Sequence, residues 1–252
     1  MNEPTGGIAR GTLYLTIASI SLFFSGLIIH FSMGRYLGPE EYGDFGVILS
    51  LMGAITIVLM AGIPDAASKY ISENDSCLGS VVRQSRRIQA VITLLLFSLY
   101  FGLAGPIANL FDDPDLARYV RISALVIPTY ALYYLHYGYL NGLRLFGKQA
   151  KTQIAVSVAR VGLVLALVFS LGVEGAILGY VLGALAGLIL ALIYLRKLDR
   201  GSTEFEWIKL LKFGLPATLF AVMLFVLMNV DLLAVKAMMS DDADAGYYTS
   251  AT

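Results

Sequence analysis

The sequence predicts an all-α integral membrane protein with seven spanning helices, the last of which opens a second copy of an internal repeat. Apolar residues make up 58% of the chain and charged residues 14%, with a mean hydropathy of +0.74. Soluble domains carry about 45–50% apolar residues and about 25% charged residues. The apolar residues gather in seven runs, each near the roughly 20 residues that a spanning helix needs. In addition, two stretches 203 residues apart share one pattern.

The seven runs follow one another with short connections. They cover residues 12–33, 42–63, 88–110, 121–143, 150–171, 176–195 and 210–239. Pro64 is expected to kink the second run, which continues as a more polar end over residues 65–72, and Gly105-Pro106 interrupts the third. In the sixth, glycine recurs every four residues from residue 175 to residue 187, which predicts a face that a neighbouring helix can approach closely.

The repeat links the start of the chain to its end. Residues 35–46 (RYLGPEEYGDFG) are expected to form the loop between the first two helices, and a related pattern returns in residues 241–251 (DDADAGYYTSA). The matched pairs are Gly11 with Gly214, Ala18 with Ala221, Gly43 with Gly246 and Phe45 with Tyr248. We interpret this as a duplication, with the first copy over residues 1–205 and the start of the second over residues 206–252.

The basic residues alternate between the two sides of the membrane. Thirteen of the eighteen Lys and Arg lie on one side of the seven helices and four on the other, while Arg160 lies within a helix. Lys and Arg are retained in the cytoplasm. We therefore predict a multi-pass protein of the cytoplasmic membrane with a cytoplasmic N-terminus. No cleavable signal peptide is expected, because the first apolar run is too long for one.

The motifs of catalysis and cofactor binding are missing from the sequence. There is no Walker loop or HExxH spacing, and the two histidines, His30 and His136, lie on different helices. Cys77 is the only cysteine, which excludes an internal disulfide and a cysteine-based metal cluster. We expect a protein that is not an enzyme, holds no cofactor or metal and binds no nucleic acid.

Polar residues inside the spanning runs are the best functional candidates, because charges there are costly and usually face a cavity or a partner. The substrate-cavity candidates are Arg160, Asp231, Lys236, Asn229, Tyr130, Tyr133 and His30. Arg160 ranks first, about 15 Å into the fifth helix, where it lines a polar cavity or makes a structural pair. Asp231 and Lys236 are either functional or paired with each other. His30 fits packing as well as function.

Other candidates also have two interpretations. Four tyrosines of the fourth helix share one face, either for packing or for sugar hydroxyls and ring faces in a cavity; these are Tyr130, Tyr133, Tyr134 and Tyr137. Tyr139 is expected in the interfacial belt. Asp65 and Lys69 have the spacing of a local ion pair, with a role in gating as the alternative. Arg118 and Arg121 either follow the acidic loop 112–115 or bind a phosphate.

Three stretches resemble the polysaccharide transporter family, described as flippases of O-antigen or lipid-linked oligosaccharide, within the multidrug/oligosaccharidyl-lipid/polysaccharide exporter superfamily. They are GRYLGPEEYGDFGVILSL, GIPDAASKYISE and LNGLRLFGKQAK, and residues 212–239 and 245–251 fit the family's seventh helix and the loop that follows it. The resemblance implies a multidrug exporter-like fold of two six-helix lobes around a central cavity. The chain would then hold a six-helix N-terminal lobe plus the first helix of a second, parallel-repeat lobe.

The resemblance also implies a function. A flippase moves lipid-linked oligosaccharide or polysaccharide precursors across the cytoplasmic membrane by alternating access. A cationic cavity would compensate the lipid phosphate, and Asp231 could couple transport to a H⁺ or Na⁺ gradient. The rivals are a drug or cation antiporter of the same superfamily, which needs carboxylates deep in the bundle, and a peptidoglycan-precursor flippase. A membrane glycosyltransferase would need larger loops with an acid–base constellation.

Overall fold

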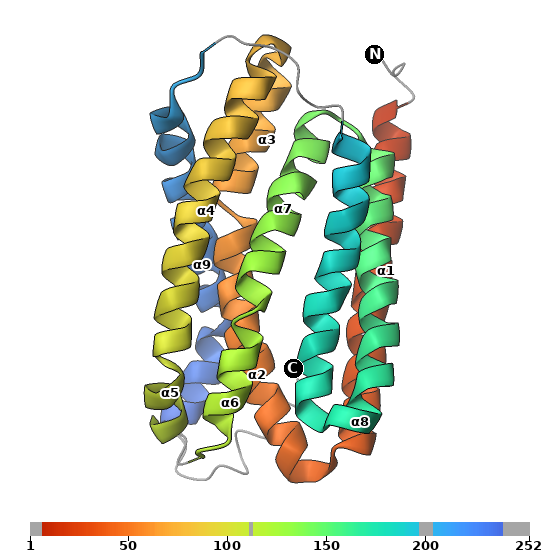
Figure 1. The fold of residues 1–252 in the computed structure, drawn as a ribbon, viewed down its shortest axis with the longest axis vertical. Coiled ribbons are helices and arrows are strands. Elements are labelled where there is room, and N and C mark those ends of the chain that lie inside the picture. The colour runs from red at the N-terminus through yellow and green to blue at the C-terminus, as the bar shows by residue number, and fades with distance from the viewer. Residues whose placement is uncertain (1–6, 111–112, 197–203, 239–252) are drawn as a thin grey trace.

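The computed structural model describes residues 7–110, 113–196 and 204–238, and this part of the chain is a bundle of helices without a strand (Figure 1). The α-helices are α1 (Gly7–Tyr36), α2 (Gly38–Met60), α3 (Ile63–Glu73), α4 (Leu78–Gly102), α5 (Ala104–Leu110), α6 (Leu116–Ser123), α7 (Val126–Gly142), α8 (Phe146–Leu195) and α9 (Trp207–Met238). A 3₁₀ turn, η1 (Asp75–Cys77), precedes α4. Helix therefore covers each of the seven predicted runs.

Several described helices are suited to cross a membrane. Ala9–Tyr36, Glu41–Glu73, Phe146–Leu195 and Trp207–Leu227 are each long and apolar enough. Helices α4 and α5, bent by 45°, meet the same length and composition criteria only when taken together, either as one broken span or as a re-entrant loop. Helix α8 turns back on itself at Gly172, where φ is +56°. Figure 1 shows it as two antiparallel legs, the first over residues 146–171 and the second over residues 173–195. The predicted fourth run is divided between α6 and the 17 residues of α7.

Prolines explain where the broken helices resume. The predicted kink at Pro64 is wrong in position: α2 ends before Gly62, which has a φ of +79°, and Pro64 lies in the first turn of α3. Pro106 and Pro128 likewise lie in the first turns of α5 and α7. Proline is tolerated there because its missing N–H would have no partner within the helix, whereas further along it would leave a carbonyl unpaired.

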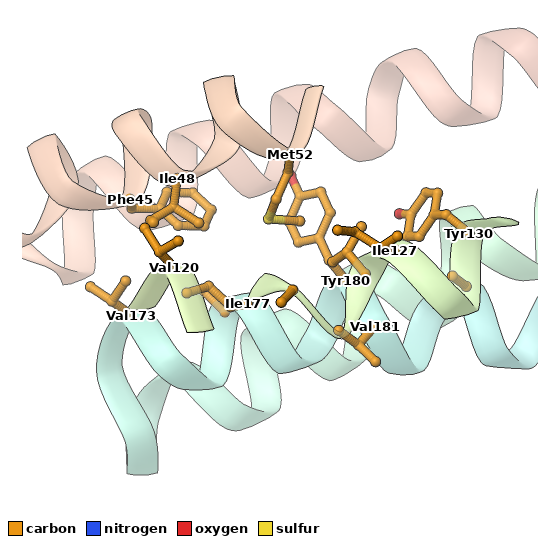
Figure 2. Close-up of a cluster of buried hydrophobic side chains, with 14 of the residues drawn as sticks. Phe45, Ile48, Met52, Val120, Ile127, Tyr130, Val173, Ile177, Tyr180 and Val181 are labelled. Carbon is orange, nitrogen blue, oxygen red and sulfur yellow. The ribbon is translucent and has the colours of Figure 1, made fainter. Parts of the chain in front are cut away.

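The stretch of residues 35–46 is helix rather than the predicted loop. Only Leu37 separates α1 from α2, and Gly38 has a φ of +74°. Because α2 begins there, Phe45 lies two turns inside it and is fully buried. Figure 2 shows Phe45 in the main core with side chains of α6, α7 and the second leg of α8. The repeat partner, residues 241–251, lies outside the described residues.

Glycines set the distance between the two legs of α8, as predicted. A Cβ atom on Gly179 would lie 2.5 Å from Val164 Cγ2, and one on Gly183 would lie 2.7 Å from Arg160 Cβ. Gly175 and Gly187 meet the first leg in the same way. A second pair on α7, Gly138 and Gly142, seats that helix on α3, and the sequence analysis did not single it out.

We expect Gly179→Ala to destabilise the protein by about 1–3 kcal/mol, the usual cost of overpacking. The added methyl would meet the backbone of Val164, which cannot move without separating the two legs. Gly162→Ala is the matched control, because nothing lies within 4 Å of its Cβ position. The measurement is the thermal unfolding midpoint in detergent, and equal midpoints for the two variants would show that the legs are not held at this distance.

Candidate functional site

The candidate site is built around Arg160, in the middle of the first leg of α8. Fourteen residues separate it from the start of the helix at Phe146, about 21 Å along the axis. Its Cβ lies against Gly183 on the second leg. The side chain is thus placed where a bilayer is driest and where snorkelling to water is difficult.

Helix α1 holds the guanidinium on one side. Arg160 donates from Nε and Nη2 to Ser25 Oγ on α1, at 3.2 and 2.8 Å, and Nη2 lies 3.5 Å from the carbonyl oxygen of Leu22. The Ser25 hydroxyl, in turn, donates to the carbonyl oxygen of Ser157 at 3.3 Å. Arg160 therefore ties α1 to α8.

Aromatic rings complete the surroundings. The Arg160 Cζ atom lies 5.0 Å from the ring centre of Tyr180, which is on the second leg of α8. Tyr130 and Tyr134 of α7, with ring centres 5.7 Å apart, lie close enough to interact electrostatically with the guanidinium. Figure 2 shows Tyr130 and Tyr180 pointing into the same core from facing helices. A guanidinium over an aromatic face is a favourable contact.

Among the side chains that the structure describes, no carboxylate forms an ion pair with Arg160. The ion pairs among the described residues are Lys69 with Glu73, Arg118 with Glu174 and Lys209 with Glu206. Hydroxyl, carbonyl and ring contacts orient the guanidinium but leave its net charge in place. This part of the bundle is therefore suited to attract an anion.

The predicted tyrosine face is packed between α7 and α8. Tyr130 and Tyr133 are buried, and Tyr133 contacts Val156 and Leu188. Tyr137 donates to Gln153 Oε1 at 2.8 Å. The structure brings only Tyr130 and Tyr134 near Arg160, because Tyr133 points toward another part of the first leg.

Three predicted candidates have side chains outside the described residues. Asn229, Asp231 and Lys236 all lie on α9. His30 is exposed on α1, with Nδ1 3.3 Å from the hydroxyl of Tyr42, away from the contacts of Arg160.

The predicted ion pair between Asp65 and Lys69 is not formed. Lys69 lies 4.0 Å from Glu73 and 4.4 Å above the ring of Phe213. Asp65 is exposed in the first turn of α3, where a negative charge is favoured by the helix dipole. Lys69 lies four residues from Asp65 and four residues from Glu73, so the spacing alone does not decide which of them it pairs with. In the structure it pairs with Glu73 and also contacts Phe213 of α9.

Arg118 has a partner that the sequence did not indicate. Its Nε lies 2.7 Å from Glu174 Oε1, and its Nη2 donates to Glu174 Oε2 at 3.0 Å. This bidentate pair joins α6 to the second leg of α8 next to Gly172. Arg121 is exposed on the next turn of α6.

A largely buried polar cluster among α3, α4 and α7 was not predicted from the sequence. Tyr139, predicted at the interface, is fully buried, and its hydroxyl lies 2.7 Å from Ser85 Oγ. Asn141 donates to Ser68 Oγ at 2.9 Å. His136 places Nδ1 2.7 Å from the Leu132 carbonyl oxygen, and its buried Nε2 has no hydrogen-bond partner in the part of the chain that the structure describes. The hydroxyl and amide side chains on these three helices are the sequence feature that could have indicated such contacts.

The described residues contain no group of three or more His, Cys, Asp and Glu side chains placed to hold a metal ion. Outside the Arg160 cluster, the exposed face of α1 carries a shallow hollow of about 700 Å³ lined in part by Thr16, Ser19 and Phe23. Hydroxyl groups on a spanning helix are better satisfied beside protein or water than beside lipid tails.

Comparison with solved structures supports the fold. An outward-facing transporter of the MATE family, in the MOP superfamily, matches with a TM-score of 0.80 and 16% identity, over 99% of this chain and 60% of that one. A MOP superfamily transporter from Pyrococcus furiosus, whose binding pocket is described as having reverse polarity, matches with a TM-score of 0.74 and 17% identity, over 99% and 60%.

Sequence comparison identifies relatives that are longer than this chain. Stage V sporulation protein B of Bacillus subtilis is 26% identical over 196 residues, 74% of this chain and 38% of the relative. The succinoglycan biosynthesis transport protein ExoT of Rhizobium meliloti is 30% identical over 96 residues, 38% of this chain and 19% of the relative. The chain thus spans less than half the length of these relatives. The family model described as "Polysaccharide biosynthesis protein" matches residues 8–252, and the chain belongs to this family of membrane proteins.

Proposed function

We propose that the chain is the N-terminal part of a flippase that moves a lipid-linked oligosaccharide or polysaccharide precursor across the cytoplasmic membrane. The observation that carries the proposal is the Arg160 guanidinium, which is held mid-helix by Ser25 and Tyr180 and has no carboxylate partner among the described residues. Such a substrate carries its negative charge on a phosphate or diphosphate. A fixed cation inside the bundle offsets part of the cost of moving that charge through hydrocarbon.

The internal repeat suggests how the substrate would pass through the protein. Residues 1–205 form one lobe, α9 begins a second lobe in the same orientation, and the substrate passes between them by alternating access. The hydroxyl-bearing face of α1 borders this passage, and the tyrosines near Arg160 offer phenol groups and ring faces to sugars. Asp231 is our candidate for coupling to a H⁺ or Na⁺ gradient.

Family and fold both support a transporter over an enzyme. The family description names polysaccharide biosynthesis, and one relative is a succinoglycan transport protein. The binding pocket of the Pyrococcus furiosus neighbour is described as having reverse polarity, which suggests a different function for that transporter. A cation antiporter would need a carboxylate in the position of Arg160 instead.

We expect Arg160→Gln to lower the translocation rate at least tenfold, because hydrogen bonds and charge contacts of an ionised group contribute about 1.5–3 kcal/mol. The assay follows a fluorescent polyprenyl-diphosphate oligosaccharide in proteoliposomes that hold the full-length transporter. Arg160→Lys keeps the charge but loses the two-point contact with Ser25, so we expect partial activity.

Arg121→Gln is the matched control, since it removes an exposed arginine of the same lobe. We expect near-normal translocation from this variant. If the wild-type protein moved no oligosaccharide but exported a cationic dye, and Arg160→Gln abolished that efflux, the protein would be an antiporter and the flippase proposal would be wrong.

The distribution of basic residues predicts which side of the membrane each connection faces. In a cysteine-free background, we expect Ser76→Cys to react with a membrane-impermeant maleimide only in inverted vesicles. Tyr36→Cys, at the opposite end of the bundle, should react in intact cells. Both positions are exposed, so access depends on the side of the membrane. The reverse labelling pattern would place the N-terminus outside.

A further inference from the structure

A second basic feature lies apart from Arg160, in a groove between α1 and the start of α8. The groove measures about 420 Å³, and its lining includes Tyr14 and Ile17 of α1 and Phe146, Lys148, Lys151 and Ile154 of α8. Lys151 precedes Arg160 by nine residues, about 13 Å along the helix. It lies at the end of the bundle that the basic-residue pattern assigns to the cytoplasm.

Small residues explain why the groove forms. A Cβ atom on Gly11 would lie 2.5 Å from Phe146 Cδ2, so the absence of a side chain there lets the Phe146 ring rest on α1. A Cβ on Gly147 would contact the Tyr14 ring at 3.6 Å. The helices touch at these points, while Ile17 and Ile154 lie further along them and line the groove.

The lining combines two chemistries. Tyr14 and Ile17 are about half exposed, at 46% and 49%, although both lie on a spanning helix. Lys148 and Lys151 are exposed, and the ion pairs of the described residues include neither of them. Arg10 lies one turn before Tyr14 on the same face of α1. The described residues that line the groove include no acidic side chain.

We propose that this groove binds an acidic glycerophospholipid of the cytoplasmic leaflet, with its phosphate at Lys148 and Lys151 and the start of one acyl chain between Ile17 and Ile154. Basic pockets between helices on the cytoplasmic side are typical sites for acidic headgroups. A soluble phosphate would leave the apolar lining without a partner. A neutral lipid would leave the charges of both lysines uncompensated, because the described contact of Lys148 is with an aromatic ring, 5.6 Å from Nζ to the ring centre of Tyr194.

The size of the groove favours a membrane phospholipid over the transported molecule. Its volume lies near the lower end of the roughly 300–1,000 Å³ of small-molecule sites, which is small for a headgroup of several sugar rings. The bound lipid would fasten the cytoplasmic half of α1 to α8. Only 17% of the most apolar 18-residue stretch of α1 is buried, so a lipid in the groove would add contacts along this helix.

The experiment measures lipid retention by native mass spectrometry of the full-length protein, with phosphatidylglycerol and phosphatidylcholine of equal chain length offered together. We expect wild type to prefer phosphatidylglycerol and the double variant Lys148→Gln/Lys151→Gln to bind it roughly ten- to thirtyfold more weakly. Arg83→Gln/Arg87→Gln, which removes two exposed charges from α4 at the same end, should keep the preference.

A second variant tests the apolar part of the groove. Ile17→Trp fills the groove and leaves both lysines in place, so we expect it to lose phosphatidylglycerol as well. The proposal is overturned if the Arg83/Arg87 variant loses the lipid equally, if either groove variant retains it, or if glycerol 3-phosphate competes as well as the lipid. Displacement by an equimolar polyprenyl-diphosphate oligosaccharide would assign the groove to the transported lipid instead. The readout needs no transport, so it stands whether or not the flippase proposal holds.

Discussion

The close approach of the two legs of α8 determines where the charge of Arg160 lies. Gly183 leaves room for the Cβ of Arg160, and Tyr180, one turn earlier on the same leg, places its ring beside the guanidinium. With a larger residue at position 183 the legs would separate, and the ring contact would be lost. The contact with Ser25 then ties α1 to this pair of legs, so the position of the edge helix depends on the same charge.

The energies explain how the bundle tolerates this charge. An arginine at the centre of a spanning helix costs about 2.5–3.5 kcal/mol on insertion scales. A desolvated contact between a guanidinium and an aromatic ring returns about 2 kcal/mol or more, and each charged hydrogen bond contributes about 1.5–3 kcal/mol. The contacts with Tyr180 and Ser25 are therefore sufficient to hold the guanidinium in place. They offset the burial of the charge without cancelling it, so it remains able to attract an anion.

The break between α2 and α3 lies where another helix, α9, packs against it. In a bilayer, irregular backbone is tolerated only where protein or a water-filled cavity covers it. The break between α2 and α3 meets this condition, because Gly62 packs against Gly214 and Thr218 of α9. Its positive φ redirects the chain, and Pro64 starts α3 in a new direction. The first helix of the proposed second lobe is thus seated on the irregular part of the first.

The sequence by itself determined the class of fold, the approximate place of the seven apolar runs and the glycine contact within α8, and it singled out Arg160 as a candidate. These features depend on local properties: hydropathy, residue size and the cost of a charge in hydrocarbon.

The sequence-based predictions misplaced the break at Pro64, gave residues 35–46 as a loop and assigned Tyr139 to the interface. Only the tertiary structure decided which partners meet, as in Arg160 with Ser25, Arg118 with Glu174 and Tyr139 with Ser85. Each of these pairs joins helices far apart in the chain, and periodicity within one helix shows that a face is buried but not which face lies opposite.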